Sequence, residues 1–245
     1  MRKNIGICKF CGQEKQLCKA HIIPQAFYKD LNIGPYFLAS KGKYAKKLPI
    51  GEYDNTILCA ECDRRIGLYD EYASRLFLKE LENFKVSHIN LYTIPKTHLD
   101  YTKLRKFIVS LIWRASISTK FTEVNLGDYE NIALQLLKEE IPDDGKYFTT
   151  LITKYSGEYF LLNGSTFVMK FRIDNTIGYH FVINGLFIDI IPSNKPFING
   201  LKSFKEYSLK NADLHIIASP NEIVKSDKLT LQFLASYDPL KKFWK

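Results

Sequence analysis

The sequence predicts an α+β fold with three successive parts, and three observations support it. Two Cys-x-x-Cys pairs lie near the N-terminus, apolar residues then recur at helical spacing, and after Gly145 apolar and polar residues alternate. We therefore expect a cysteine-rich module over residues 1–80, a helical segment over 81–145 and a β-rich lobe over 146–245. The alternative is that the two lobes share one core.

The composition excludes several classes of protein. A chain of 245 residues that is 46% hydrophobic can bury a sizeable core, which excludes wholesale disorder. No stretch approaches the roughly 18 consecutive apolar residues of a membrane span, and the first residues lack the pattern of a secretory signal. We therefore expect no membrane association and a reducing, cytoplasmic setting, where cysteines serve metals or catalysis more often than disulfides.

Four of the five cysteines have the spacing of metal ligands. Cys8 and Cys11 form the first pair, and Cys59 and Cys62 form the second. Four thiolates can close a tetrahedral zinc shell, so two such pairs in one chain favour a structural Zn²⁺ over redox chemistry. The 47 residues between the pairs exceed the spacing of a simple zinc ribbon, which predicts an insertion. Cys18 is left over and is expected to be an ordinary small buried residue.

Three segments have helical periodicity. The first runs from Tyr69 to about Phe84, and the third from about Asp128 to Ile141. Between them, Tyr101–Thr119 has the clearest amphipathic pattern, and the residues off its apolar stripe are Lys103, Lys106, Ser110 and Arg114. The stripe consists of residues at i, i+3, i+4, i+7 and i+8, namely Leu104, Phe107, Ile108, Leu111 and Ile112.

The C-terminal part has the alternation of β-strands. In residues 167–173, the positions with Phe, Met, Phe and Ile alternate with those of Val, Lys and Arg. This alternation predicts a half-buried strand. Tyr179–Ile183 and Leu186–Ile191 flank Asn184-Gly185, the pair that a two-residue type I′ hairpin turn prefers. Another short strand is expected at Leu214–Ala218.

The positive charge is concentrated near the N-terminus. The net charge is +9, and residues 1–50 carry ten Lys or Arg against two acidic residues. Residues 51–100 instead carry six basic and nine acidic residues. A basic segment beside an acidic one suits a polyanion-binding surface next to a cation-binding site. The alternative is a solvated, lysine-rich surface.

The insertion between the cysteine pairs contains Ala20-His21-Ile22-Ile23-Pro24. Two β-branched residues followed by proline indicate the end of a strand whose backbone then turns away. Taken alone, such a histidine is more often structural than catalytic. Its position between two metal-binding pairs makes His21 a candidate for chemistry.

Together these features resemble one family. In chain order they are Cys8-x-x-Cys11, the Ala20 to Pro24 motif, and Asp54-Asn55-Thr56-Ile57-Leu58-Cys59-Ala60-Glu61-Cys62-Asp63. The combination resembles the HNH nuclease superfamily, the ββα-metal or His-Me finger endonucleases, in the branch that carries an extra four-cysteine zinc. The resemblance covers about residues 5–75, which is under a third of the chain.

The resemblance implies a hairpin and a helix around one divalent cation. His21 matches the general base, a task that suits imidazole because its unperturbed pKa is about 6.5. The middle family residue is usually an asparagine five positions before the third cysteine. Asp54 occupies that position and Asn55 follows it, so either could hold the loop that carries the histidine. Asp63 matches the third position, where a carboxylate suits Mg²⁺ or Mn²⁺.

The chain departs from the family pattern immediately before the histidine. Many members have Asp, Glu or His there as a metal ligand, whereas this chain has Ala20. Asp70 could supply a second carboxylate, because a spacing of seven residues is close to two helical turns and places it on the side of Asp63. Asp70 could instead be an exposed acid on the helix surface, and the site could be degenerate, a zinc-bound fold without catalysis.

The resemblance also implies a nucleic-acid partner. The 32 residues between His21 and Asp54 are long for a hairpin connection, so we expect a surface excursion. Because members of the family usually act on DNA, the resemblance implies DNA as the partner, and RNA is the alternative. Basic residues in this excursion and after Asp63 could contact phosphates; they are Lys41, Lys43, Lys46, Lys47, Arg64 and Arg65.

The sequence therefore predicts a metal-dependent endonuclease with a structural Zn²⁺ and a catalytic Mg²⁺ or Mn²⁺. The alternative is a non-catalytic, zinc-dependent nucleic-acid-binding or scaffold protein. By analogy alone, a module of this kind beside an unfamiliar lobe suits bacterial antiviral defence. A third possibility is that the β-rich lobe binds a partner protein that licenses cleavage.

Overall fold

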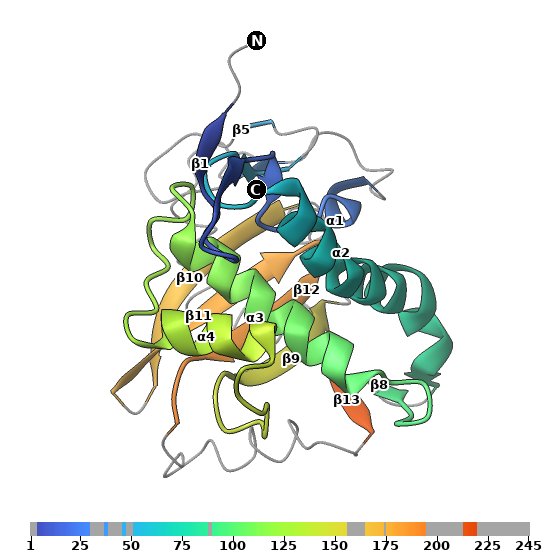
Figure 1. The fold of residues 1–245 in the computed structure, drawn as a ribbon. Coiled ribbons are helices and arrows are strands. Elements are labelled where there is room, and N and C mark those ends of the chain that lie inside the picture. Colours follow the sequence, from blue (N-terminus) through green and yellow to red (C-terminus); the bar gives the residue numbers. More distant parts are fainter. Residues whose placement is uncertain are drawn as a thin grey trace.

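The structure is a computed structural model, and it confirms the predicted α+β class (Figure 1). It describes residues 4–29, 37–38, 46–47, 51–87, 90–155, 165–173, 175–194 and 213–219. The helices are α1 (Ala26–Lys29), α2 (Ala60–Arg75), α3 (Tyr101–Ile117) and α4 (Tyr129–Lys138), with a π-helical turn η1 (Leu76–Glu80) and a 3₁₀ turn η2 (Leu81–Phe84) after α2.

The strands are short in the N-terminal part and longer in the C-terminal part. The first eight are β1 (Ile5–Ile7), β2 (Glu14–Gln16), β3 (Ala20–His21), β4 (Phe37–Leu38), β5 (Lys46–Lys47), β6 (Tyr53–Asp54), β7 (Lys85–Val86) and β8 (Leu91–Ile94). The others are β9 (Thr149–Tyr155), β10 (Ser165–Ile173), β11 (Thr176–Ile183), β12 (Leu186–Ile191) and β13 (Leu214–Ser219).

The described strands form three sheets. Two are small antiparallel pairs, β1–β2 and β3–β6. The other nine strands of the described chain form one sheet in the order β5-β4-β10-β11-β12-β9-β13-β8-β7. Within it β10, β11, β12 and β9 pair antiparallel, whereas β4 is parallel to β10 and β13 is parallel to β9. The large sheet thus takes strands from all three predicted parts of the chain.

The predicted excursion between His21 and Asp54 contributes to this sheet. In its described residues, β4 pairs with β10 and β5 pairs with β4. The described part of the excursion is therefore a two-stranded extension at the edge of the large sheet, joined to the C-terminal lobe through β4.

The buried side chains form one core that extends from Cys8 to Ala218. Figure 1 shows α3 and α4 lying across one face of the large sheet. The cysteine-rich part packs on α3, since the ring of Phe10 meets Trp113 edge-on with centroids 5.9 Å apart. This arrangement agrees with the alternative in which the lobes share one core.

Helix α3 is the central element of the fold. Asp100 caps its first turn by accepting a hydrogen bond from the Lys103 N–H at 3.0 Å. The helix contacts α2 and α4. For this reason Ser110 and Arg114, which lie off the apolar stripe, are nevertheless buried, with 0% and 1% of their surface exposed.

The predicted hairpin is confirmed. Asn184 and Gly185 have φ of 50° and 73°, and they join β11 to β12 as a type I′ turn requires. In β10, Thr166 and Val168 are buried, Met169 and Phe171 are half-buried, and Lys170 and Arg172 are exposed. Val168 lies opposite Phe181, and both side chains belong to the core.

Candidate functional site

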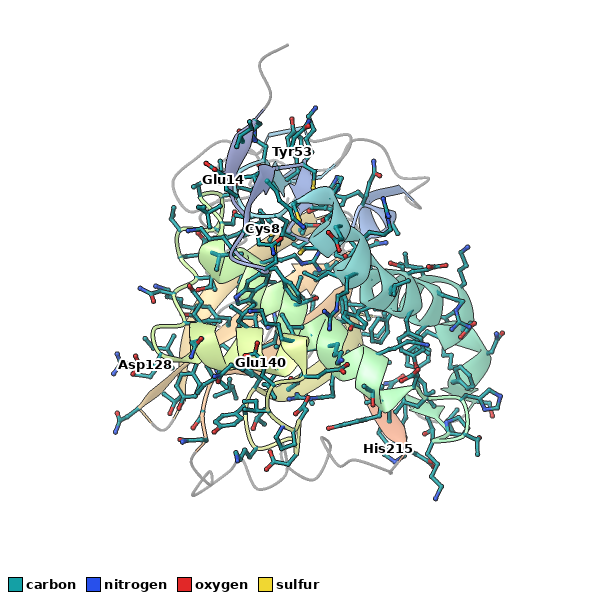
Figure 2. The ribbon with its side chains drawn as sticks, viewed as in Figure 1. Cys8, Glu14, Tyr53, Asp128, Glu140 and His215 are labelled. Atoms are coloured by element: carbon teal, nitrogen blue, oxygen red, sulfur yellow. The ribbon has the colours of Figure 1, made fainter. Side chains whose placement is uncertain are left out.

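The four cysteines of the two predicted pairs come together. The Sγ atoms of Cys8, Cys11, Cys59 and Cys62 all lie within 4.8 Å of one another, and three of these residues are buried. Four sulfur ligands about 2.3 Å from one ion would be about 3.8 Å apart, so the cluster can hold a metal ion. Among the described residues, no other group of three or more metal-ligating side chains is as close. Figure 2 shows Cys8 near the first turn of α2.

Local backbone geometry assembles this cluster. Gly12 has a φ of 73°, which favours glycine, and its N–H donates to the carbonyl of Cys8 at 2.8 Å. Cys59 precedes α2, and its N–H donates to the Sγ of Cys8 at 3.4 Å. Burial raises the pKa of Cys8, but backbone N–H groups, including those of Cys11 and Cys59, outweigh it and lower that pKa to about 7. The thiolate form of Cys8, which a metal needs, is thereby favoured, whereas burial raises the pKa of Cys62.

Cys18 lies outside the four-sulfur cluster. It is half-buried, and burial together with the negative charge of Asp63 raises its pKa to about 11. Cys18 is therefore held as a thiol near the cleft described below.

His21 is fixed by a strand and by an arginine. It ends β3, which pairs antiparallel with β6 so that Ala20 lies opposite Asp54 and His21 opposite Tyr53. The rings of His21 and Tyr53 meet edge-on with centroids 6.2 Å apart. The carbonyl oxygen of His21 accepts a hydrogen bond from Nη1 of Arg114 at 2.8 Å. Arg114 therefore connects the end of β3 to α3.

Asp54 fastens the partner strand to the end of α3. Its Oδ1 accepts from the N–H and hydroxyl of Thr56 at 2.8 and 2.6 Å. Its Oδ2 accepts from the hydroxyl of Ser118 at 3.3 Å and from the N–H and hydroxyl of Thr119, both at 2.9 Å. Burial raises the pKa of Asp54, but these bonds outweigh it and lower that pKa to about 2.

Of the two residues predicted for the middle position, only Asp54 is buried. Asp54 is 1% exposed, whereas Asn55 is an exposed residue. Neither lines the cleft that contains His21. Asp54 therefore acts on the site through the backbone of β6 and β3.

Asp63 and Asp70 lie on one face of α2 and line the same cleft as His21. Burial raises the pKa of Asp63, and the carboxylate of Asp70 adds to that rise. The positive charge of Arg114 acts in the opposite direction. The two carboxylates, the imidazole and the guanidinium thus share one electrostatic environment.

Asp70 is bound to Arg114 by two hydrogen bonds. Nη1 and Nη2 of Arg114 donate to the two carboxylate oxygens at 2.8 and 2.7 Å. The side chains of Arg114 and Asp70 are only 1% and 15% exposed, so the alternative of an exposed surface acid is wrong. Burial raises the pKa of Asp70, and the charge and hydrogen bonds of Arg114 oppose that rise.

Arg114 is the residue that the sequence pattern did not identify. Its Nε donates to the carbonyl of Ser110 at 3.2 Å, so one buried guanidinium links α3, α2 and β3. The available signal was its position beside Trp113 in a strongly apolar helix, where a charged residue requires a buried partner. The partner, 44 residues away in the chain, could not be identified from spacing.

The cleft has a volume of about 420 Å³. One side is formed by residues 21 and 24–26, and the other by the face of α2 and η1 that runs from Asp63 to Lys79. It contains acidic groups near His21, and Arg75 and Lys79 towards its far end. Ala20 is completely buried and offers no ligand atom, so the predicted gap before the histidine persists.

The predicted phosphate-contacting residues are spread over several places. Arg64 and Arg65 are exposed on α2, and the guanidinium of Arg65 lies 5.4 Å from the centroid of the Phe10 ring. Lys46 and Lys47 form β5 at the edge of the large sheet, and their side chains lie outside the described part. Lys41 and Lys43 lie outside the described residues.

Comparison of the chain with family models, with curated proteins and with solved structures found no match. In the described part of the chain, no helix combines the length and the apolar character needed to cross a membrane.

Proposed function

We propose that this chain is a metal-dependent endonuclease that hydrolyses phosphodiester bonds in DNA. The observation that carries the proposal is that His21 and Asp63 line one cleft, at the end of β3 and in the first turns of α2. The four-cysteine cluster lies at the start of the same helix. The order β3, β6, α2 is the order of elements that the resemblance to the HNH superfamily implies.

The cysteine cluster supports zinc as the structural metal. Four sulfur ligands are the donor set that tetrahedral Zn²⁺ accepts in structural sites, and their mutual separation fits one ion. Zinc there would join the β1–β2 hairpin to α2, since Cys8 and Cys11 follow β1 while Cys59 and Cys62 lie at the helix start.

The cleft suits a cation that keeps part of its water shell. The described residues place no third carboxylate, histidine or cysteine beside Asp63 and Asp70 at a distance that would close an all-protein site. Mg²⁺ is commonly held by one or two carboxylates with water and phosphate oxygens completing the shell. Asp63 would hold such a cation, with Asp70 beside it in an ion pair with Arg114.

His21 would perform the proton transfer. Its imidazole takes a proton from water, the water oxygen attacks phosphorus, and the bond to the 3′-oxygen breaks with its electron pair on that oxygen. The 3′-oxygen then takes a proton from a second water molecule, leaving a 5′-phosphate and a 3′-hydroxyl. A bound Mg²⁺ or Mn²⁺ would polarise the scissile phosphate and stabilise the departing oxygen. Arg114 and Asp54 would hold the histidine-bearing strand in place, because each joins this strand pair to α3.

The decisive experiment is plasmid nicking with Mg²⁺ or Mn²⁺. Nicking by the wild-type chain is expected, and His21→Ala should lower its rate by about 100-fold to 10,000-fold because it removes the general base. The matched control is His98→Ala, since His98 is exposed and does not line the cleft. Equal nicking by the His21→Ala protein, with its fold intact, would refute the assignment. The same assay with DNA and with RNA substrates decides which nucleic acid the protein cleaves.

A non-catalytic zinc protein is the second candidate, and two observations favour it. Ala20 offers no ligand, and both carboxylate oxygens of Asp70 already accept hydrogen bonds from Arg114. Titration with Mn²⁺ separates the candidates. The nuclease requires an exchangeable cation that is lost in Asp63→Asn but retained in Asp128→Asn, which changes an exposed acid outside the cleft, whereas the scaffold binds none beside its tight zinc.

The biological setting is proposed by analogy with other modules of this type. A cytoplasmic role in antiviral defence suits a nuclease joined to a lobe that could receive a licensing partner. If such a partner is required, the native complex should nick DNA under conditions in which the isolated chain does not.

A further inference from the structure

Gly67 stands in the middle of α2, on the face that lines the cleft. Glycine is one of the least favourable residues inside a helix, because it loses the most backbone freedom and leaves the backbone open to water. A glycine at such a position therefore needs a reason.

The usual structural reasons do not apply to Gly67. A Cβ atom at this position would meet no atom within 4 Å, so no close approach of a neighbouring element requires glycine. At Gly178, by contrast, a Cβ would lie 2.3 Å from the ring of Phe171. Gly67 is also not among the described glycines with positive φ, and α2 continues regularly through it to Arg75.

A side chain at position 67 would enter the cleft near Asp63. Cα–Cβ bonds in an α-helix tilt towards the N-terminus, so a residue covers the turn that precedes it. Asp63 is four residues earlier, which is about 6 Å along the helix axis. The missing side chain therefore leaves open the part of the cleft that Asp63 and His21 line.

We infer that Gly67 determines access to the site, because its lack of a side chain admits the sugar–phosphate backbone of a nucleic acid to His21 and Asp63. This inference rests on the proposed function. It is supported by Arg75 and Lys79, which line the same cleft further along, where the flanking phosphates of a bound strand need positive charge.

Two substitutions of different size test the inference. Gly67→Ala and Gly67→Leu should both fold and melt about 2–4 °C higher than wild type, since each replaces glycine by a better helix former in open space. Nicking in Mn²⁺ should fall at least about 100-fold in Gly67→Leu, because a side chain there displaces the substrate, and less in Gly67→Ala. The control is Leu68→Phe, which adds bulk at an exposed position outside the cleft and should nick at the wild-type rate.

A binding measurement separates this inference from the nuclease assignment. In the His21→Ala background, Gly67→Leu should weaken binding of a fluorescent DNA oligonucleotide by about tenfold or more, whereas Leu68→Phe should not. If wild type binds DNA but does not nick it and this difference remains, the nuclease proposal fails and the role of Gly67 stands. Equal binding and equal nicking by the Gly67→Leu protein, or no DNA binding by either form, would overturn the inference.

Discussion

The buried carboxylate of Asp54 connects two elements of the fold. It accepts five hydrogen bonds from Thr56, Ser118 and Thr119, and it thereby joins the strand opposite His21 to the end of α3. The resemblance to the HNH superfamily indicated a residue that holds the histidine-bearing loop. The hydrogen bonds of Asp54 are consistent with that task, although its side chain does not line the cleft.

Asp54 should make stability depend on pH in acid. Because its pKa is lowered from 3.8 to about 2, its ionised form stabilises the folded state by about 2 kcal/mol above pH 4. This contribution is lost as the pH falls through about 2. Asp54→Asn should therefore be less stable than wild type at pH 7 by at least that amount, and the difference should shrink between pH 5 and pH 2.

Urea denaturation of both proteins across this pH range provides the measurement. Taking the difference between the two removes the effect of acid on the cysteine cluster, which both share. A difference in unfolding free energy that stays constant down to pH 2 would contradict the lowered pKa.

Individual site residues could be predicted where the signal is local. The cysteines and His21 were candidates because their short spacings and neighbours are informative by themselves, and the cysteines do meet in the structure. Arg114 and Gly67 were not found. The role of Arg114 depends on Asp70, which lies 44 residues away, and the role of Gly67 depends on the empty space around it.

At the scale of elements, Arg114 links three parts of the site. Arg114→Leu would leave the buried carboxylate of Asp70 without its cation and would release the carbonyl of His21. The unfolding free energy should fall by about 3–5 kcal/mol, measured by urea denaturation. Arg64→Leu, on the exposed side of α2, should change it by less than about 0.5 kcal/mol.

The same pair offers a test that does not depend on complete folding of one variant. Combining Arg114→Leu with Asp70→Asn should cost less than the sum of the two single changes, because the double variant buries no uncompensated charge. Strictly additive losses would show that the two side chains stabilise the fold independently.

Long elements could be predicted from the sequence more readily than short ones. The long periodic segments gave α3, α4 and the β11–β12 hairpin. The two-residue strands β3 and β6 are too short for a pattern, and only the motif around His21 indicated them. Helix α3 misled in one respect, because Ser110 and Arg114, which lie off its apolar stripe, are buried instead of facing water.

At the scale of the whole molecule, one core should make the metal important to the entire fold. The cluster of buried residues includes Cys8 and Cys59 as well as strands of the large sheet. Removing zinc with a chelator should therefore lower the temperature of a single cooperative melting transition, instead of melting the N-terminal part alone. Differential scanning calorimetry with and without chelator provides the measurement.

The matched controls for this prediction come from the cysteines themselves. Cys62→Ser should lose the bound zinc and melt like the chelated protein, whereas Cys18→Ser should keep one zinc ion per chain by elemental analysis. Two separate transitions in the chelated protein would contradict a shared core.

The overall architecture could not be derived from the sequence because its decisive pairings are distant. β4 at Phe37–Leu38 pairs with the start of β10, and β8 pairs with β13 more than 100 residues later. Local patterns identify strands but do not determine which strand lies beside which. The three predicted parts are therefore recognisable along the chain, while the sheet and the core cross their boundaries.

The pairing of β8 with β13 has a consequence for how the protein is made. During synthesis on the ribosome, β8 (residues 91–94) cannot pair with β13 until residues 214–219 have left the exit tunnel. The cysteine cluster needs only the first 62 residues, so a metal ion can bind there early. The bound ion would then hold residues 8 and 11 close to residues 59 and 62 while translation supplies the remaining strands.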